Sequence, residues 1–458
     1  MNSTLVAAKN EIDAQFVTDI VAKALQAGAS DAEAVFAEGD EFETLVRLGQ
    51  VEQLKEAGSR ALGLRVFQGQ RTASTSTSDL SADGIEQLIS GAMALVRVTS
   101  DDPFAGLPEQ EEFGSLSGDL DLFYDDVYSL PVTERIEYAR RTEAAAMATD
   151  PRIQNSGGGG FDAATGRKVL ANSRGFVGES RRSSCAISTQ PIALSPDGGM
   201  QRDYWYSSQR SLHLLDSPEA VGQEAARRTV RRLGARRVAT QRVALVFSPE
   251  VAKSILGAIM SAINGNAVYR SSSFLAGKLG ENVAGSNLTV IDDGATPGGF
   301  GSAPFDGEGL PTRRKVVLDQ GVLTSYLLNT YTARKLGLQS TGNAARGLAG
   351  SPGIGAGNFY LEPGNKTPEE IIAEIPAGLY VTELIGHGVN IVTGDYSHGA
   401  SGLWIENGEL AYPVEEITVA GNLKEMLQNV SEIGSDLIFR GAVACPTLRI
   451  EGMTIAGE

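Results

Sequence analysis

The chain has 458 residues, of which 42% are hydrophobic, and a formal net charge of −17 at pH 7. This length allows two or three domains with ordinary globular cores. The negative charge argues against a nucleic-acid partner, because phosphate backbones repel an acidic surface. No apolar run approaches the ~20 residues that cross a bilayer, so no membrane partner is expected.

The first half predicts the order helix, antiparallel strands, helix, and then repeats it. An amphipathic helix is expected at 9–27 and a second helix near 81–98, with short strands between them at 32–37, 41–48, 51–55, 61–67 and 71–77. The turns between these strands are assigned to Gly39, Gly49, Gly58 and Gly69.

A polar stretch at 99–121, predicted to be a linker or a long loop, separates this pattern from its repeat. The repeat begins with a helix near 133–148 and continues with strands near 153–157, 169–172, 177–190 and 203–214 and a helix near 217–233. The pattern predicts an α+β N-terminal domain at residues 1–235, with an antiparallel sheet, flanking helices and two similar halves at about 1–100 and 125–235.

Six arginines follow one another on and after the last of these helices: Arg227, Arg228, Arg231, Arg232, Arg236 and Arg237. A patch that binds anions or nucleic acid is one interpretation. The preferred interpretation is a solvated face or domain seam that pairs with acidic neighbours, because the chain as a whole is acidic.

Residues 240–458 predict a C-terminal domain that is mostly β and barrel-like. Its first strand, Arg242–Phe247, has the continuous apolar character of a buried strand. The next helix begins at Ser248, whose hydroxyl is expected to cap the first turn, and ends at Asn264-Gly265, where a positive φ is expected.

Later elements of this half are shorter. Strands are expected at 288–291, 316–318 and 322–328, and helices at 330–336 and after the capping box at Thr367, followed by short β segments between glycines.

The helix after Ser248 contains no metal ligand of the expected kind. A strand that leads into a helix is a common place for zinc, held by two histidines on one turn with a glutamate between them. No histidine lies between His213 and His387, so the helix is predicted to be core.

Two glycine-rich loops, Gly294–Gly309 and Gly353–Gly357, invite comparison with phosphate-binding loops. A phosphate cradle needs a strand before it and a helix N-terminus after it. Pro352 precedes the second loop and an extended segment follows it, so nucleotide binding is rejected. Loops over a binding groove are the expectation.

One segment groups the candidate site residues Glu383, His387, Asp395, Tyr396 and His398. Histidine and carboxylate side chains together can hold a metal or transfer protons. A strand–turn–strand also brings such residues together by sequence alone, so substrate contact without catalysis is the intermediate interpretation.

Two cysteines, Cys185 and Cys445, do not make a disulfide framework, and no signal peptide is predicted at the N-terminus. Both features indicate a cytoplasmic protein. Cys445 is interpreted as a buried structural thiol, with a metal ligand or nucleophile as the alternative.

Several strings resemble the PmbA (TldE) branch of the TldD/PmbA family across nearly the whole chain. They include Ser248–Ala252, Val268–Arg270, Thr312–Arg314, Ala333–Leu338, Val381–Gly388, Thr393–Ser397 and Trp404–Lys424. Near Cys445 the sequence departs from this likeness.

The resemblance implies pairing with a TldD-like subunit that carries His-Glu-x-x-x-His on the corresponding helix and a later cysteine as ligands of a catalytic zinc. Here the corresponding segment, Ile255–Ala262, holds no ligand, so no cofactor is expected on this chain and zinc is expected in the partner. The implied role is that of a non-catalytic subunit of a heterodimeric zinc metalloprotease acting on unfolded peptides. Microcin-type maturation, leader removal and antitoxin turnover are the processes that the family implies.

Two rival interpretations stay open. One is a stand-alone metallohydrolase that uses His387, His398 and Asp395. The other is a regulatory binding module linked to DNA gyrase. A homodimer is also left open.

Overall fold

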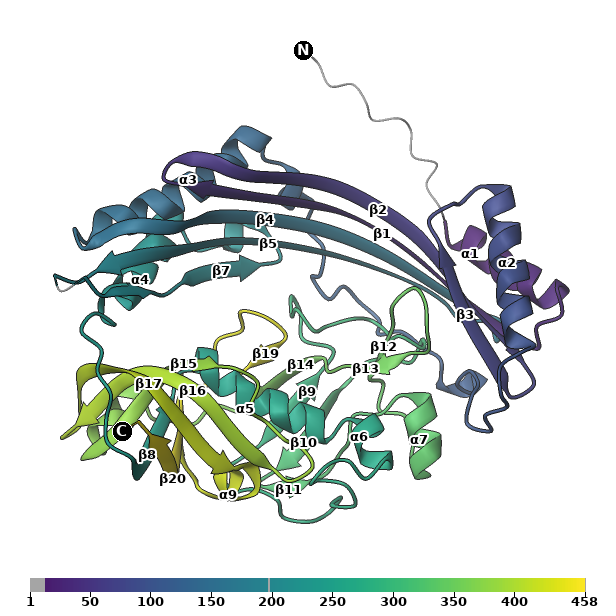
Figure 1. Ribbon diagram of the computed structural model, residues 1–458. Coiled ribbons are helices and arrows are strands. Elements are labelled where there is room, and N and C mark those ends of the chain that lie inside the picture. The colour runs from purple at the N-terminus through teal and green to yellow at the C-terminus, as the bar shows by residue number, and fades with distance from the viewer. Residues whose placement is uncertain (1–12, 197, 458) are drawn as a thin grey trace.

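The computed structural model describes residues 13–196 and 198–457. It is α+β, as predicted: a long curved antiparallel sheet arches over a β-rich domain (Figure 1). Within the described residues, no helix is long and apolar enough to cross a membrane. Positions 9–12 of the first predicted helix lie outside these residues.

The N-terminal sheet has strands in the order β3-β2-β1-β4-β5-β6, with β7 also paired to β5. The predicted repeat of helix, strands and helix is present. The first half contributes α1 (Ala14–Gln26), β1 (Asp31–Arg47), β2 (Gln50–Gln68), β3 (Arg71–Thr77) and α2 (Ala82–Val96). The second contributes α3 (Val132–Thr149), β4 (Ile153–Asn172), β5 (Val177–Leu194), β6 (Met200–Arg202), β7 (Trp205–Gln209) and α4 (Pro218–Val230). The antiparallel pair of β1 and β4 joins the two halves.

Half of the predicted glycine turns are wrong. Gly49 and Gly69 do form turns, with φ of 76° and 61°. Gly39 and Gly58 instead lie inside β1 and β2, which are therefore 17 and 19 residues long. A Cβ at Gly39 would lie 2.6 Å from the carbonyl oxygen of Thr165, so this glycine serves a close approach between strands.

The strands predicted at 153–157 and 169–172 are one continuous strand, β4. The glycines at 157–160 do not end it. A Cβ at Gly159 would lie 2.2 Å from the carbonyl oxygen of Ala139, so glycine is required there for α3 to pack closely on the sheet. The strand predicted at 203–214 is also shorter, because β7 ends at Gln209.

Two helix pairs cover opposite ends of the convex face of the sheet (Figure 1). At one end, α1 and α2 pack on a core that includes Phe36 and Leu62. At the other end, helices α3 and α4 pack on Phe42 and Phe161. Because side chains alternate along a strand, the intervening odd-numbered residues of β1 face the C-terminal domain.

The C-terminal half contains a closed five-stranded barrel, which confirms the barrel-like prediction. Its strands run β17-β16-β15-β8-β20, and β17 pairs with β20 to close it. They are β8 (Gln241–Phe247), β15 (Ala377–Ile385), β16 (Asp395–Glu406), β17 (Glu409–Asn422) and β20 (Leu448–Ala456), and β18 (Val430–Ile433) pairs outside the ring.

A second sheet lies beside the barrel in the order β11-β10-β9-β14-β19. Its strands are β9 (Val290–Asp293), β10 (Arg314–Asp319), β11 (Val322–Leu323), β14 (Asn358–Leu361) and β19 (Val443–Ala444), and β12 (Ala344–Ala345) pairs separately with β13 (Gly353–Ile354). The strand predicted at 322–328 is thus only its first two residues.

The helices of this half are α5 (Pro249–Ala262), α6 (Gly265–Tyr269), α7 (Thr330–Leu336), α8 (Pro368–Ala373) and α9 (Leu423–Gln428). The capping box at Thr367 is confirmed, and α7 ends as predicted at Gly337, with φ 66°.

The segment predicted as a linker at 99–121 packs against the C-terminal domain. Leu107 is fully buried. The N–H of Gly114 donates to the carbonyl of Gly309 at 3.0 Å, and that of Leu116 donates to Pro304 at 2.8 Å. This segment therefore fastens the arch to the domain beneath it.

Candidate functional site

Helix α5 lies on the side of the C-terminal domain that faces the arched sheet (Figure 1). Strand β8 ends directly before Ser248, and Pro249 lies in the first turn of α5. The prediction that the Ser248 hydroxyl caps this turn is wrong. Among the described residues the buried hydroxyl has no hydrogen-bond partner, whereas the Ser248 carbonyl accepts from the N–H groups of Val251 and Ala252.

The end of α5 also differs from the prediction. Asn264 has φ −63° and begins α6, with its side chain accepting from the N–H of Asn266 at 3.0 Å. Gly265 has no positive φ. It is needed because a Cβ there would lie 2.6 Å from the hydroxyl of Thr332.

The buried face of α5 is apolar, and its partly exposed face offers no imidazole or carboxylate along Ile255–Ala262. The partly exposed or exposed positions after the first turn are Lys253, Ser254, Gly257, Met260 and Ser261. Zinc in proteins takes histidine, cysteine or carboxylate ligands. The residues of this helix do not fit a zinc site.

The residues predicted near the β15–β16 turn come together only in part. Tyr396 and His398 are buried on one face of β16, with ring centroids 4.6 Å apart. His387 is exposed in the turn. Asp395 lies on the opposite face of β16, where it accepts hydrogen bonds from Thr393 and Asn422.

His398 is placed for structure rather than for metal binding. Its Nδ1 lies 3.1 Å from the carbonyl of Gly386, which accepts from it, and its Nε2 is buried. Burial lowers the pKa of His398, and burial raises the pKa of Tyr396 to about 12, so both rings are neutral near pH 7. Over residues 13–196 and 198–457, no group of three or more His, Cys, Asp or Glu is placed to hold a metal ion.

Glu383 belongs to the seam between the two halves. Its carboxylate accepts a short hydrogen bond from the Arg232 guanidinium. Beside this pair lies a groove of about 610 Å³ that Met200 and Gln201 of β6 also line. The candidate residues of this segment thus divide between a seam groove, an exposed turn and the barrel core.

The pairing with acidic neighbours that was predicted for the arginine run is present for Arg227, Arg228, Arg232 and Arg237. Arg228 lies 3.5 Å from Asp203, and Arg237 pairs with Glu416 of β17. Arg227 pairs with a glutamate one turn earlier in α4. Arg232 and Arg237 therefore pair across the seam, with Glu383 and Glu416.

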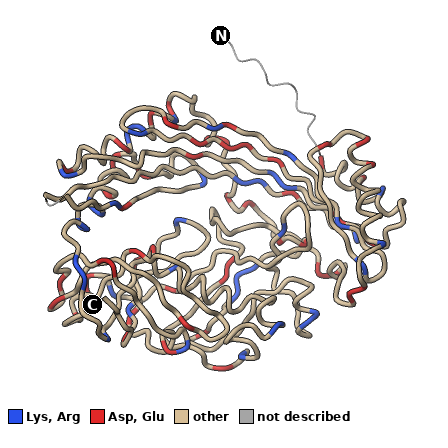
Figure 2. Tube along the Cα trace, in the orientation of Figure 1, with Lys and Arg blue, Asp and Glu red and all other residues tan. Residues whose placement is uncertain are grey.

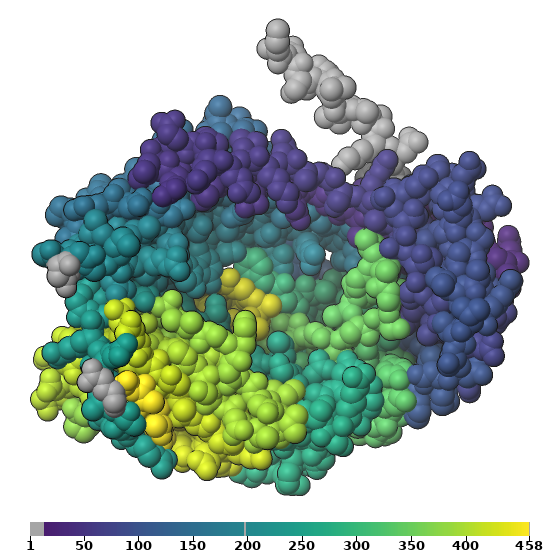
Figure 3. Space-filling model, viewed as in Figure 1, coloured from purple at the N-terminus to yellow at the C-terminus, as the bar shows by residue number. Residues whose placement is uncertain are grey.

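A cavity of about 550 Å³ lies between the concave face of the sheet and the C-terminal domain. Figure 3 shows the molecule hollowed between the arch and the domain below it. Both glycine-rich loops line the cavity, and they approach so closely that a Cβ at Gly301 would lie 2.3 Å from the carbonyl carbon of Gly357. The sequence motif indicated a groove, and these loops are its wall.

A buried carboxylate organises the floor of this cavity. Asp292 lies on β9 and accepts from the Nζ of Lys315 at 2.6 Å, from Asn343 at 2.8 Å and from the N–H of Gly357 at 2.6 Å. These bonds fix the loops around a single charge. Sequence reasoning missed this cluster, because its members are distant along the chain and carry no shared motif.

The roof of the cavity is cationic. Arg346 reaches up from the C-terminal domain to Glu33 on β1, which also pairs with Arg65 on β2, and all of these side chains are buried. Lys168 and Arg182 line the same roof. Figure 2 shows lysines and arginines on strands of the arch above the C-terminal domain.

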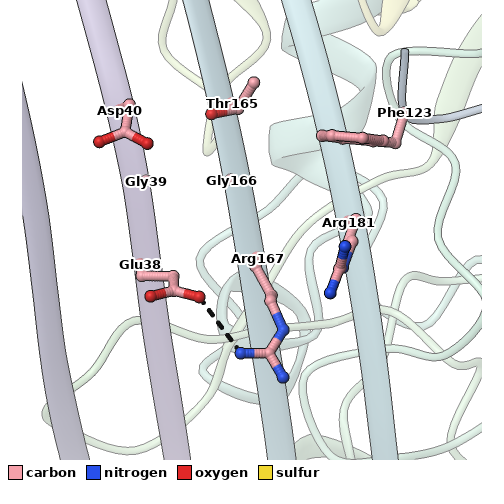
Figure 4. Close-up of a pocket in the computed structure, with 8 residues that line it drawn as sticks. All are labelled: Glu38, Gly39, Asp40, Phe123, Thr165, Gly166, Arg167 and Arg181. Carbon is pink, nitrogen blue, oxygen red and sulfur yellow. Dashed lines mark hydrogen bonds and ion pairs between the residues drawn. The ribbon is translucent and has the colours of Figure 1, made fainter. Parts of the chain in front are cut away.

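A smaller pocket, of about 370 Å³, lies on the convex face in the gap between the helix pairs (Figure 4). Glu38, Asp40 and Arg167 line it from the strands, and Phe123 lines it from the loop. Arg167 donates to Glu38 at 3.2 Å and also pairs with Glu179, so the positive charge here is neutralised.

Both cysteines are buried. Burial raises the pKa of Cys185 to about 12 and raises that of Cys445 further. A thiol that stays protonated is a poor nucleophile and a poor metal ligand, which supports the structural interpretation of Cys445.

This fold and sequence define a peptidase-related class of protein. Profiles of the PmbA/TldA metallopeptidase domains match residues 32–96 (domain 1), 125–233 (central domain) and 240–457 (C-terminal domain). The chain belongs to the PmbA/TldA metallopeptidase family, which confirms the resemblance found in its motifs.

Its relatives cover almost its whole length. It is 38% identical to the metalloprotease PmbA of Escherichia coli O157:H7 over 454 residues, which is 98% of each protein. A crystal structure from Bacteroides thetaiotaomicron, named as a candidate modulator of DNA gyrase, matches with TM-score 0.90 and 28% identity over 97% of this chain and 98% of that one. TldE from Thermococcus kodakarensis shares the fold, with TM-score 0.85 and 22% identity over 97% of this chain and 100% of that one.

Proposed function

We propose that this chain is the subunit of a two-subunit metalloprotease that lacks the catalytic zinc site, and that a TldD-like chain supplies the zinc. Helix α5 carries the proposal, because its segment Ile255–Ala262 offers no zinc ligand where the resemblance places the ligands of the partner. The rest of the described chain, 13–196 and 198–457, has no alternative cluster of three metal-binding side chains.

The role left for such a subunit is to hold the peptide and complete the chamber. The cavity of about 550 Å³ lies within the range of ~300–1,000 Å³ that is typical of ligand sites. Its walls include exposed loop backbone, and an extended peptide can be held by main-chain hydrogen bonds with little dependence on sequence. A folded substrate cannot enter such a space, so unfolded peptides are the substrate class that we propose.

The test is to produce this chain with and without a chain that carries His-Glu-x-x-x-His. Size-exclusion chromatography and cleavage of an unstructured casein fragment are measured for each chain alone and for the mixture. We expect one complex of both chains and cleavage only by the mixture. Cleavage by this chain alone, lost on His387→Ala, would favour the metallohydrolase instead.

A regulatory role has one supporting observation, the name of the Bacteroides relative as a candidate modulator of DNA gyrase. A pull-down with purified gyrase tests it. Capture of gyrase, together with no cleavage on mixing with any TldD-like chain, would favour this second candidate.

A further inference from the structure

Two cations, Lys168 and Arg182, line the cavity roof. Among the described residues, no carboxylate lies within ion-pair distance of Lys168 or Arg182. Within the part of the chain that the structure describes, the Nζ of Lys168 donates only to the carbonyl of Arg346, at 3.3 Å. In a chain of net charge −17, two neighbouring cations without a direct ion pair in one concave place favour an anionic ligand there.

The sheet register brings these two side chains together. Arg182 on β5 lies opposite Gly166 on β4, and Lys168 is two residues further along the same strand. Residues two apart on a strand share a face. A Cβ at Gly166 would lie 3.4 Å from Nε of Arg182, so the guanidinium lies across the space left by the glycine.

Neighbouring carboxylates offset the charge of this pair only in part, because each has other partners. Glu33 is taken up by Arg65 and Arg346. Asp306 faces the same cavity, but its oxygens accept from the N–H groups of Glu308, Leu310 and Ala344. On the floor, Asp292 is held by Lys315.

Burial and the neighbouring guanidinium groups both act on the ammonium group of Lys168. Burial, followed by Arg346 and Arg182, lowers the pKa of Lys168 to about 8, although Asp306 and Glu33 act in the opposite direction. A further cation, Arg210, is buried nearby between the carbonyls of Ser183 and Gly299. Burial and Arg182 lower its pKa to about 10.

We infer that Lys168 and Arg182 form a carboxylate-binding site in the cavity roof, which holds acidic groups of the peptide substrate. Arginine offers a planar fork of donors that matches a carboxylate, and lysine adds a point charge. The inference rests on the proposed role in peptide binding and adds a preference for acidic peptides. The carboxylate can be a side chain or the peptide C-terminus.

Binding is measured by fluorescence anisotropy with the full chain alone. The probe is a short unstructured peptide labelled at its N-terminus, made with glutamate or with glutamine at the same positions, and with a free or amidated C-terminus. We expect the glutamate peptide to bind more tightly than the glutamine peptide and to weaken with added salt. If binding depends on the free C-terminus and not on glutamate, the group that the site holds is the α-carboxylate of the peptide.

Two variants and one matched control localise the effect. Arg182→Gln and Lys168→Met should each weaken binding of the glutamate peptide by about tenfold or more, because hydrogen bonds to charged groups are the stronger kind. Both should leave the amidated glutamine peptide unaffected. Arg97→Gln, which removes an exposed charge at the end of α2, should change neither. Circular dichroism checks that each variant is folded.

The pH dependence gives a second readout. Affinity for the glutamate peptide should fall as pH rises through about 8, where Lys168 loses its proton, and this fall should be absent in Lys168→Met. Equal binding of all four peptides, no binding of any of them, or variants without effect would each overturn the inference. The proposed function would survive any of these results if mixing with a TldD-like chain still produced cleavage.

Discussion

The buried ion cluster that joins the arch to the C-terminal domain makes a quantitative prediction. Glu33 is fully buried between Arg65 and Arg346, whose side chains are 6% and 1% exposed. Glu33→Gln keeps the shape but leaves two buried guanidinium groups facing each other, with the carboxyl group of Glu308 as the remaining acidic group that acts on Arg65 among the described residues. Removing one member of a buried ion pair costs about 3–5 kcal/mol, and we expect a loss of that size in the free energy of unfolding.

Urea unfolding followed by circular dichroism measures this loss. The control is Glu362→Gln, which removes the partner of the half-exposed Arg314 and should cost about 1 kcal/mol or less. The double variant of Glu33→Gln with Arg346→Met should recover part of the stability, since it removes one of the two opposed cations. A cost for Glu33→Gln no larger than that of the control would refute this account of how the halves are joined.

Three further predictions concern stability and reactivity. Burial raises the pKa of Glu308 to about 7, so the stability that its neutral form contributes is complete below pH about 4.5 and is lost as pH rises through about 7. Glu308→Gln should therefore become more stable than the parent protein by up to about 3 kcal/mol between pH 5 and 8, as measured by urea titration. Parallel pH profiles of the two proteins would contradict this. Gly388→Ala should lower the melting temperature, because its Cβ would overlap a carbonyl of β16, whereas Gly257→Ala on α5 meets nothing within 4 Å and should add about 0.5–1 kcal/mol. Cys185 and Cys445 should react with Ellman's reagent only after denaturation, and rapid labelling of the native protein would show that they are not buried as described.

Local patterns in the sequence predicted the helices well. The caps of α7 and α8 depend on a few neighbouring residues, such as Thr367 and Gly337, and both were predicted correctly. The repeated order of helices and strands was also readable, since each helix has an apolar face.

The long strands could not be predicted, for a physical reason. Glycine usually marks turns, but Gly39 and Gly159 serve close packing against Thr165 and Ala139, contacts between residues far apart in the sequence. The same glycine can mark a turn or allow close packing between strands and helices. At these two positions close packing is the reason for the glycine, so the strand continues through it.

The charged residues that line the cavity could not be predicted from the sequence either. Lys168 and Arg182 belong to different strands and meet only through the register of β4 and β5. The contacts of Asp292 join β9 to loops more than fifty residues further along the chain. By contrast, the cluster suggested by Asp395 and His398 was close in sequence, and the strand places those side chains on opposite faces.

Zinc content is the measurement that tests the central claim most directly. The isolated full-length chain, and the same chain in complex with a TldD-like subunit, are analysed by inductively coupled plasma mass spectrometry after gel filtration. The account predicts no bound zinc in the isolated chain and zinc in the complex in proportion to the partner. Stoichiometric zinc in the isolated chain, with proteolysis that chelators abolish, would contradict it.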